Sequence, residues 1–225
     1  MPPGMPFQNY SAEILYSFVI ILCSLLIYFE TRKLYELSSH KGIKYLRESF
    51  LFFAIAYFFR SFIKIVFISM DPPKIMNISP VLTQFTSMFV FIYFSSMAIF
   101  YLVYSMVWKK WDLSNKIYLF HLAALIISTV SLVLNSSRIY LLINFFILLI
   151  ILGVTYKEYI ASGKHKKKKN ALYIIYILLF TFWILNVIDI LVPEFLKTFQ
   201  LLIYLFSLGI FLTILYKVLK QVGSN

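Results

Sequence analysis

The first long apolar segment, AEILYSFVIILCSLLIYFETRKL at Ala12–Leu34, decides the fold class. It exceeds the roughly 20 mostly apolar residues that a helix needs to cross a bilayer. Six more segments meet the same criterion, at Tyr45–Ser69, Val81–Trp108, Lys116–Leu134, Arg138–Tyr159, Ala171–Val192 and Glu194–Leu219. The sequence therefore predicts an all-α integral membrane protein in which residues 1–225 form one bundle of seven transmembrane helices.

The composition agrees with this class. The chain is 61% hydrophobic and 13% charged, whereas soluble domains are about 45–50% apolar and about 25% charged. The N-terminal tail lacks the basic residues that open a secretory signal, so the first segment is expected to be a span. A single cysteine, Cys23, excludes a disulfide within the chain and a cysteine-rich metal centre. We expect no cofactor and no metal site.

The basic residues predict the orientation of the bundle. Sixteen of the 21 Lys and Arg residues fall in the first, third and fifth connections or at the C-terminus, against three on the opposite side, Lys74, Arg138 and Lys197. Basic loops face the cytoplasm in membrane proteins. We therefore expect a multi-pass protein of the cell membrane with its N-terminus outside and its C-terminus in the cytoplasm. The richness in Lys, Ile and Phe suggests a prokaryotic source.

Two basic connections have more than one interpretation. The run SGKHKKKKN contains Lys164, Lys166, Lys167, Lys168 and Lys169. These lysines either attract anionic lipid head groups at the cytoplasmic face or serve only to orient the chain. The connection at Leu34–Phe50 is either a capped turn, in which Gly42 ends the first helix, or a docking surface for a cytoplasmic partner. A homo-oligomer stays open, and nucleic-acid binding is not expected.

The stretch AYFFRSFIKIVF at Ala56–Phe67 places Arg60 and Lys64 inside the second span, on one helical face. Each cation costs about 2.5–3.5 kcal/mol at the centre of a bilayer. We expect Asp189 and Asn186 of the sixth span to face them, with Arg60–Asp189 as the main ion pair of an outer polar pocket. Two further polar residues of the outer half, Glu13 and Gln84, are assigned to the same pocket. The alternative is a buried pair with a purely structural role.

Known motifs do not extend this interpretation. Rhodopsin-like proteins also have seven spans, but this chain lacks the lysine of a retinal Schiff base in mid-membrane, since Lys217 lies at the inner end of its span. No catalytic nucleophile motif or phosphate-binding loop occurs, so an enzyme is not expected. The sequence favours a sensor or receptor-like bundle for a small anionic or lipid-derived ligand. An anion or small-solute channel or transporter, and a structural or assembly protein, are the alternatives.

Overall fold

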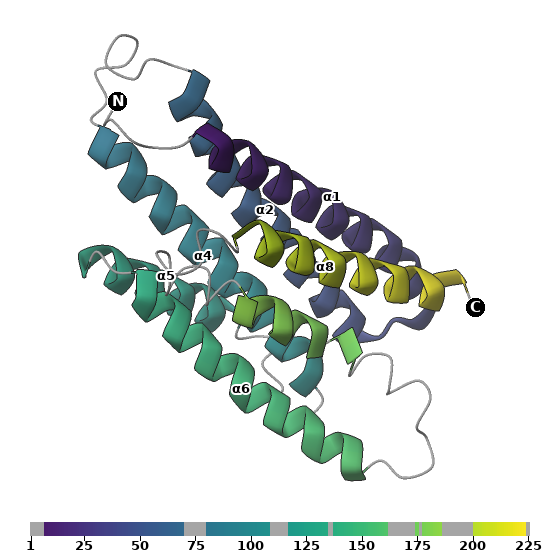
Figure 1. Ribbon diagram of the computed structural model, residues 1–225. Coiled ribbons are helices and arrows are strands. Elements are labelled where there is room, and N and C mark those ends of the chain that lie inside the picture. Colours follow the sequence, from purple (N-terminus) through teal and green to yellow (C-terminus); the bar gives the residue numbers. More distant parts are fainter. Residues whose placement is uncertain are drawn as a thin grey trace.

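The computed structural model describes residues 7–69, 80–108, 117–134, 137–161, 174–175, 177–185 and 200–223. All regular structure in these ranges is helical (Figure 1). The helices are α1 (Phe7–Ser38), α2 (Lys41–Ser69), α4 (Pro80–Val107), α5 (Tyr118–Val133), α6 (Ser137–Ala161) and α8 (Gln200–Gly223), and residues 174–175 and 177–185 are helical as well. The predicted all-α class is therefore confirmed.

Within the described ranges, three helical segments are long and apolar enough to cross a membrane, at Ile14–Leu37, Met88–Ser105 and Leu201–Lys220. Two shorter apolar helices follow the same pattern, at Tyr118–Val133 and Ile139–Ile150. α2, which carries Arg60 and Lys64, is not among the three. These lengths and compositions are those of a helical membrane protein.

Each described helix lies at a predicted span, but several extend further. α1 begins at Phe7 and continues to Ser38, beyond the predicted end at Leu34. Its last turns are polar and carry the Arg32–Glu36 ion pair at i and i+4, which supports a helix without hydrophobic burial. α8 likewise continues to Gly223. The length of the apolar run determines how much of a helix lies in lipid, and the helix continues beyond the end of that run in polar turns.

α2 and α4 form the centre of the bundle. α2 packs against α1 on one side and α4 on the other, α8 lies along α1, and α4 also contacts α5 and α6. Aromatic rings fill the interior: the ring of Phe182 lies 4.6 Å from that of Phe211 on α8, and Phe211 also contacts Phe50 and Phe53 of α2. The helical stretch 177–185 is thus held against both α2 and α8.

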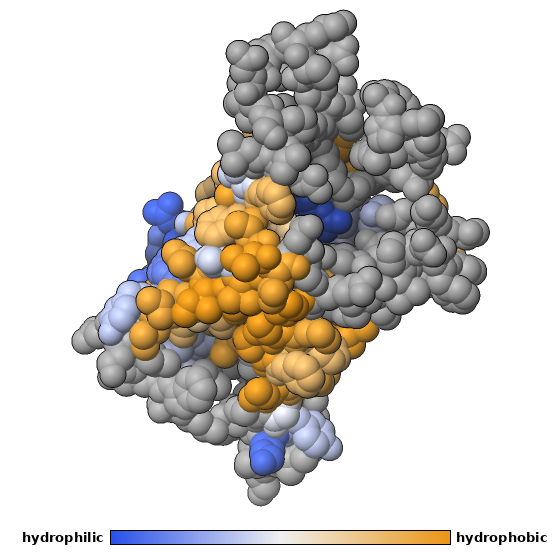
Figure 2. Space-filling view, turned by 90° about the vertical axis from the view of Figure 1, so that its left-hand side faces the viewer, coloured by the Kyte–Doolittle hydropathy of each residue, from blue (hydrophilic) through white to orange (hydrophobic). Residues whose placement is uncertain are grey.

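The bundle buries small polar side chains and exposes large apolar ones. Ser24, Ser96 and Ser128 are fully buried, while Phe18, Leu122 and Phe206 are exposed. Figure 2 shows a continuous hydrophobic area on one side of the molecule. Small residues at helix contacts and large apolar residues outside are the pattern of helices that pack within lipid.

The turn between α1 and α2 corrects one prediction. Gly42 does not end the first helix: α1 ends at Ser38, and Ser39 adopts the left-handed conformation, with a φ of 49°. Gly42 lies in the first turn of α2, where an added Cβ would come within 2.8 Å of both the Ser105 carbonyl oxygen and Trp108 Nε1. Its role is to let the start of α2 approach the end of α4 closely.

Candidate functional site

Arg60 faces the interior of the bundle. Its guanidinium carbon lies 5.8 Å from the ring centroid of Tyr57 on α2 and 5.5 Å from that of Phe91 on α4. The exposed side of α2 is formed instead by Phe58 and Phe62. A cation over aromatic faces gains about 2 kcal/mol or more when the contact is desolvated. Aromatic faces of α2 and α4 therefore form part of the surroundings of Arg60.

Tyr57 connects this cation to three other elements. Its ring makes an edge contact with Tyr16 of α1, at 6.1 Å between centroids, and lies 6.4 Å from Phe182 of 177–185. Tyr16 in turn stacks on Tyr204 of α8, with centroids 4.5 Å apart and planes at 15°. Aromatic side chains thus join α1, α2, α8 and 177–185 at the level of Arg60.

A second set of aromatic contacts leads from Phe91 of α4 to α6. The ring of Phe91 lies 6.1 Å from that of Tyr140, and Tyr140 makes an edge contact with Trp183 at 5.8 Å. The Tyr140 hydroxyl is 2.5 Å from Ser95 Oγ, and it lies within the electrostatic influence of Arg60. We call the central group the Arg60 cluster, and it comprises Tyr16, Tyr57, Arg60, Phe91 and Tyr140.

Asn144 adds a buried polar contact one turn below Tyr140. Its Nδ2 donates to Ser96 Oγ at 3.2 Å and to the Tyr140 carbonyl oxygen at 3.0 Å. Within the described part of the chain, Asn144 Oδ1 and Trp183 Nε1 are buried without a hydrogen-bond partner. The Ser95–Tyr140 and Ser96–Asn144 pairs therefore form a polar seam between α4 and α6.

The other predicted pocket residues are only partly placed. Lys64, Glu13 and Gln84 lie in α2, α1 and α4, and the description does not extend to their side chains. Asn186 and Asp189 lie outside the described residues, as do the five lysines Lys164, Lys166, Lys167, Lys168 and Lys169. The proximity of the second and sixth spans that an Arg60–Asp189 pair requires is present between Tyr57 and Phe182.

Sequence reasoning missed the aromatic members of the site. The chain has 17 Tyr and 24 Phe residues, distributed over every span, so aromatic spacing could not single out Tyr16, Tyr57, Phe91 or Tyr140. Only the packing of the helices brings these rings to one level. In the part of the chain that the structure describes, no three His, Cys, Asp or Glu side chains are grouped as a metal site would require.

The helices and their composition define the chain as a helical membrane protein. It is 31% identical over 234 residues to a protein of Archaeoglobus fulgidus described as uncharacterized, and the alignment covers 98% of this chain and all of the archaeal protein. The chain belongs to the same family as that protein. No protein-family model matches the chain, and no solved structure matches it.

Proposed function

We propose that this protein is a membrane-embedded sensor or receptor-like bundle that binds a small anionic or lipid-derived ligand beside the Arg60 cluster. The observation that carries the proposal is the position of Arg60 over the rings of Tyr57 and Phe91. A charge in the interior of a membrane protein is costly, and such residues commonly mark binding sites or ion paths.

The surroundings of Arg60 favour an anion with an apolar part. The guanidinium offers five N–H donors in a planar arrangement that suits carboxylate and phosphate groups. The flanking rings of Tyr57, Phe91 and Tyr140 provide apolar surface, and the tyrosine hydroxyls add groups that can donate or accept. Because α1, α2, α4, α6, α8 and 177–185 all contribute contacts near this cation, a ligand there would touch most of the bundle and could change how its helices pack.

The proposed topology has seven spans, with the N-terminus outside and the C-terminus in the cytoplasm. It is supported by the sixteen-to-three distribution of basic residues between the two sides. A reporter enzyme that works only in the cytoplasm should be active when it is fused after Asn225. A cysteine introduced into the N-terminal tail should be accessible to labelling from outside the cell. A C-terminal reporter located outside the cell would contradict the seven-span topology.

Binding is tested on the purified full-length protein by thermal unfolding in the presence of benzoate, decanoate and inorganic phosphate. A ligand at 100 times its Kd stabilises a protein by about 2.7 kcal/mol, so at least one of these anions should raise the unfolding temperature in a saturable way. Arg60→Gln should lose the shift. Lys220→Gln is the control for the loss of one positive charge, because Lys220 is exposed in the last turn of α8, and it should keep the shift.

Liposome flux separates this function from the main alternative. An inward-facing arginine also suits an anion path, since basic side chains line anion pores. Vesicles containing the protein should show no chloride or benzoate flux above protein-free vesicles if the bundle is a sensor. Robust flux that Arg60→Gln abolishes would identify a channel or transporter instead. If the protein showed neither anion binding nor flux, a structural or assembly role would be the remaining function.

A further inference from the structure

A second group of cations lies at the other end of α2, where α1 and α2 meet. Arg47 of α2 is held against Tyr28 of α1, with its guanidinium carbon 4.6 Å from the ring centroid and a terminal nitrogen donating to the Tyr28 hydroxyl at 3.3 Å. The same terminal nitrogen lies 3.7 Å from Glu48 Oε1, and only 17% of the Arg47 side chain is exposed. These contacts fix the guanidinium in one orientation before any ligand arrives.

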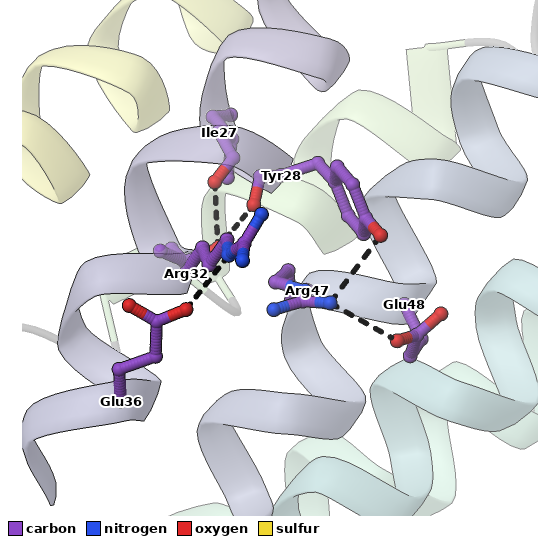
Figure 3. Close-up of polar contacts among 7 residues, drawn as sticks. Ile27, Tyr28, Arg32, Glu36, Arg47 and Glu48 are labelled. Atoms are coloured by element: carbon purple, nitrogen blue, oxygen red, sulfur yellow. Dashed lines mark hydrogen bonds and ion pairs between the residues drawn. The ribbon is translucent and has the colours of Figure 1, made fainter.

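Arg32 of α1 is directed to the same place. It lies one turn beyond Tyr28, and its Nε donates to Glu36 Oε1 at 2.7 Å. Figure 3 shows the guanidinium groups of Arg32 and Arg47 on either side of the gap between α1 and α2. An anion between the two guanidinium groups could accept charge-assisted hydrogen bonds from both. Each guanidinium has five N–H donors, and the bonds described here leave donors on both.

The surrounding charge also favours an anion. The inner ends of α1 and α2 carry five cations, and Lys33, Lys41 and Lys44 among them are exposed, against the three carboxylates of Glu30, Glu36 and Glu48. Phosphate is well suited to two guanidinium groups, because its oxygens accept paired N–H bonds from each of them.

An apolar stripe leads directly to these cations. Leu22, Leu26 and Phe29 are exposed along one side of α1, 47%, 41% and 59% respectively, and they precede Arg32 within the candidate membrane span Ile14–Leu37. A phospholipid places its acyl chains along such a stripe while its phosphate sits at the boundary, which is the depth where arginine side chains collect. Free phosphate would gain nothing from the stripe.

We propose that the gap between the ends of α1 and α2 is a binding site for one anionic phospholipid, with Arg32 and Arg47 holding the phosphate and the Leu22–Phe29 side of α1 contacting an acyl chain. This site is separate from the Arg60 cluster. It does not depend on the proposed sensor function.

The test is equilibrium binding of didecanoyl phosphatidylglycerol to the delipidated full-length protein, followed by native mass spectrometry. One phosphatidylglycerol should bind saturably, at least about ten-fold more tightly than didecanoyl phosphatidylcholine, since charge-assisted hydrogen bonds to an anionic head group are the strong ones. Arg32→Gln combined with Arg47→Lys should weaken this binding at least about ten-fold, because the substituted pair loses the paired N–H geometry.

Three controls make the result specific. Lys41→Gln removes the same charge at the same end of the bundle without touching the gap, and Arg60→Gln alters the other site; both should retain phosphatidylglycerol. Neutralising the five lysines at 164–169 should weaken only the part of the lipid binding that is salt-sensitive and does not saturate. Arg32→Gln alone is the second variant, since Arg32 is 66% exposed and its loss should leave the fold intact, with binding reduced about three-fold or more.

Three outcomes would overturn the proposal. Equal affinity for phosphatidylglycerol and phosphatidylcholine would show that the head-group charge is not recognised. Unchanged affinity in Arg32→Gln and in the double variant would exclude these two residues as ligands. Competition by inorganic phosphate at concentrations equal to the lipid would show that the site takes a free anion and not a lipid.

Discussion

Replacing Arg60 with glutamine should lower the free energy of unfolding by about 3–5 kcal/mol. Removing one member of a buried ion pair leaves the other charge without compensation, and that cost falls in this range. The substitution also removes the cation from the faces of Tyr57 and Phe91. The measurement is reversible unfolding in mixed micelles, followed by far-UV circular dichroism and tryptophan fluorescence. Asp189→Asn should have an effect of similar size, because Asp189 is the proposed partner.

A double-mutant cycle decides whether Arg60 and Asp189 are paired. If they are, the double variant should be much less destabilised than the sum of the two single variants, with a coupling energy of about 0.5–3 kcal/mol. Arg32→Gln is the control for the loss of one exposed arginine: its pair with Glu36 is exposed on both sides and should contribute less than about 1 kcal/mol. Additive effects of Arg60→Gln and Asp189→Asn would contradict the pairing and leave the aromatic contacts as the main support of Arg60.

Replacing Gly42 with alanine should destabilise the bundle by about 1–3 kcal/mol, the usual range for overpacking a tight contact. The new methyl group would come within 2.8 Å of the Ser105 carbonyl oxygen, which is backbone and cannot rotate away. It would also press on Trp108, whose ring already makes an edge contact with His40 at 5.1 Å. The start of α2 would have to move away from the end of α4, and unfolding under the same conditions measures the cost.

Gly209→Ala is the matched control for this substitution. Gly209 lies within α8, and a Cβ added there meets nothing within 4 Å. Alanine is a better helix former than glycine by about 0.8–1.0 kcal/mol in exposed helix interiors, so Gly209→Ala should leave the stability unchanged or raise it. Equal effects of the two substitutions would contradict the close approach of α2 and α4 at Gly42.

The inward position of Arg60 follows from the sequence, whereas its neighbours do not. An arginine in the middle of an apolar segment has to turn away from lipid, because an exposed charge there is costly. The identity of the facing groups depends on how six elements pack. Phe91 of α4 contacts Arg60 directly, whereas Tyr16 of α1 packs on Tyr57 and Tyr140 of α6 packs on Phe91. No local pattern distinguishes these rings from the many other aromatic residues.

The α1–α2 turn is a second place where contacts with another helix could not be predicted from the sequence. Glycine is the residue that most readily ends a helix in the left-handed conformation, which is why Gly42 appeared to be the terminator. Here Ser39 adopts that conformation instead, and the glycine lies where Ser105 of α4 and Trp108, the residue after that helix, come close. A requirement imposed by a neighbouring helix is invisible in the local sequence of the turn.

The sequence by itself determined the helical membrane class and the approximate positions of the helices, because both depend on the length and polarity of single segments. It also indicated that Arg60 would turn away from lipid, since that follows from the cost of one charge in lipid. Only the tertiary structure decided that Tyr57 and Phe91 lie under the cation, that Ser95 and Ser96 join α4 to α6, and that Arg47 and Arg32 share one gap. Those contacts are set by the rotation and spacing of whole helices, to which each residue contributes only a small part of the packing energy.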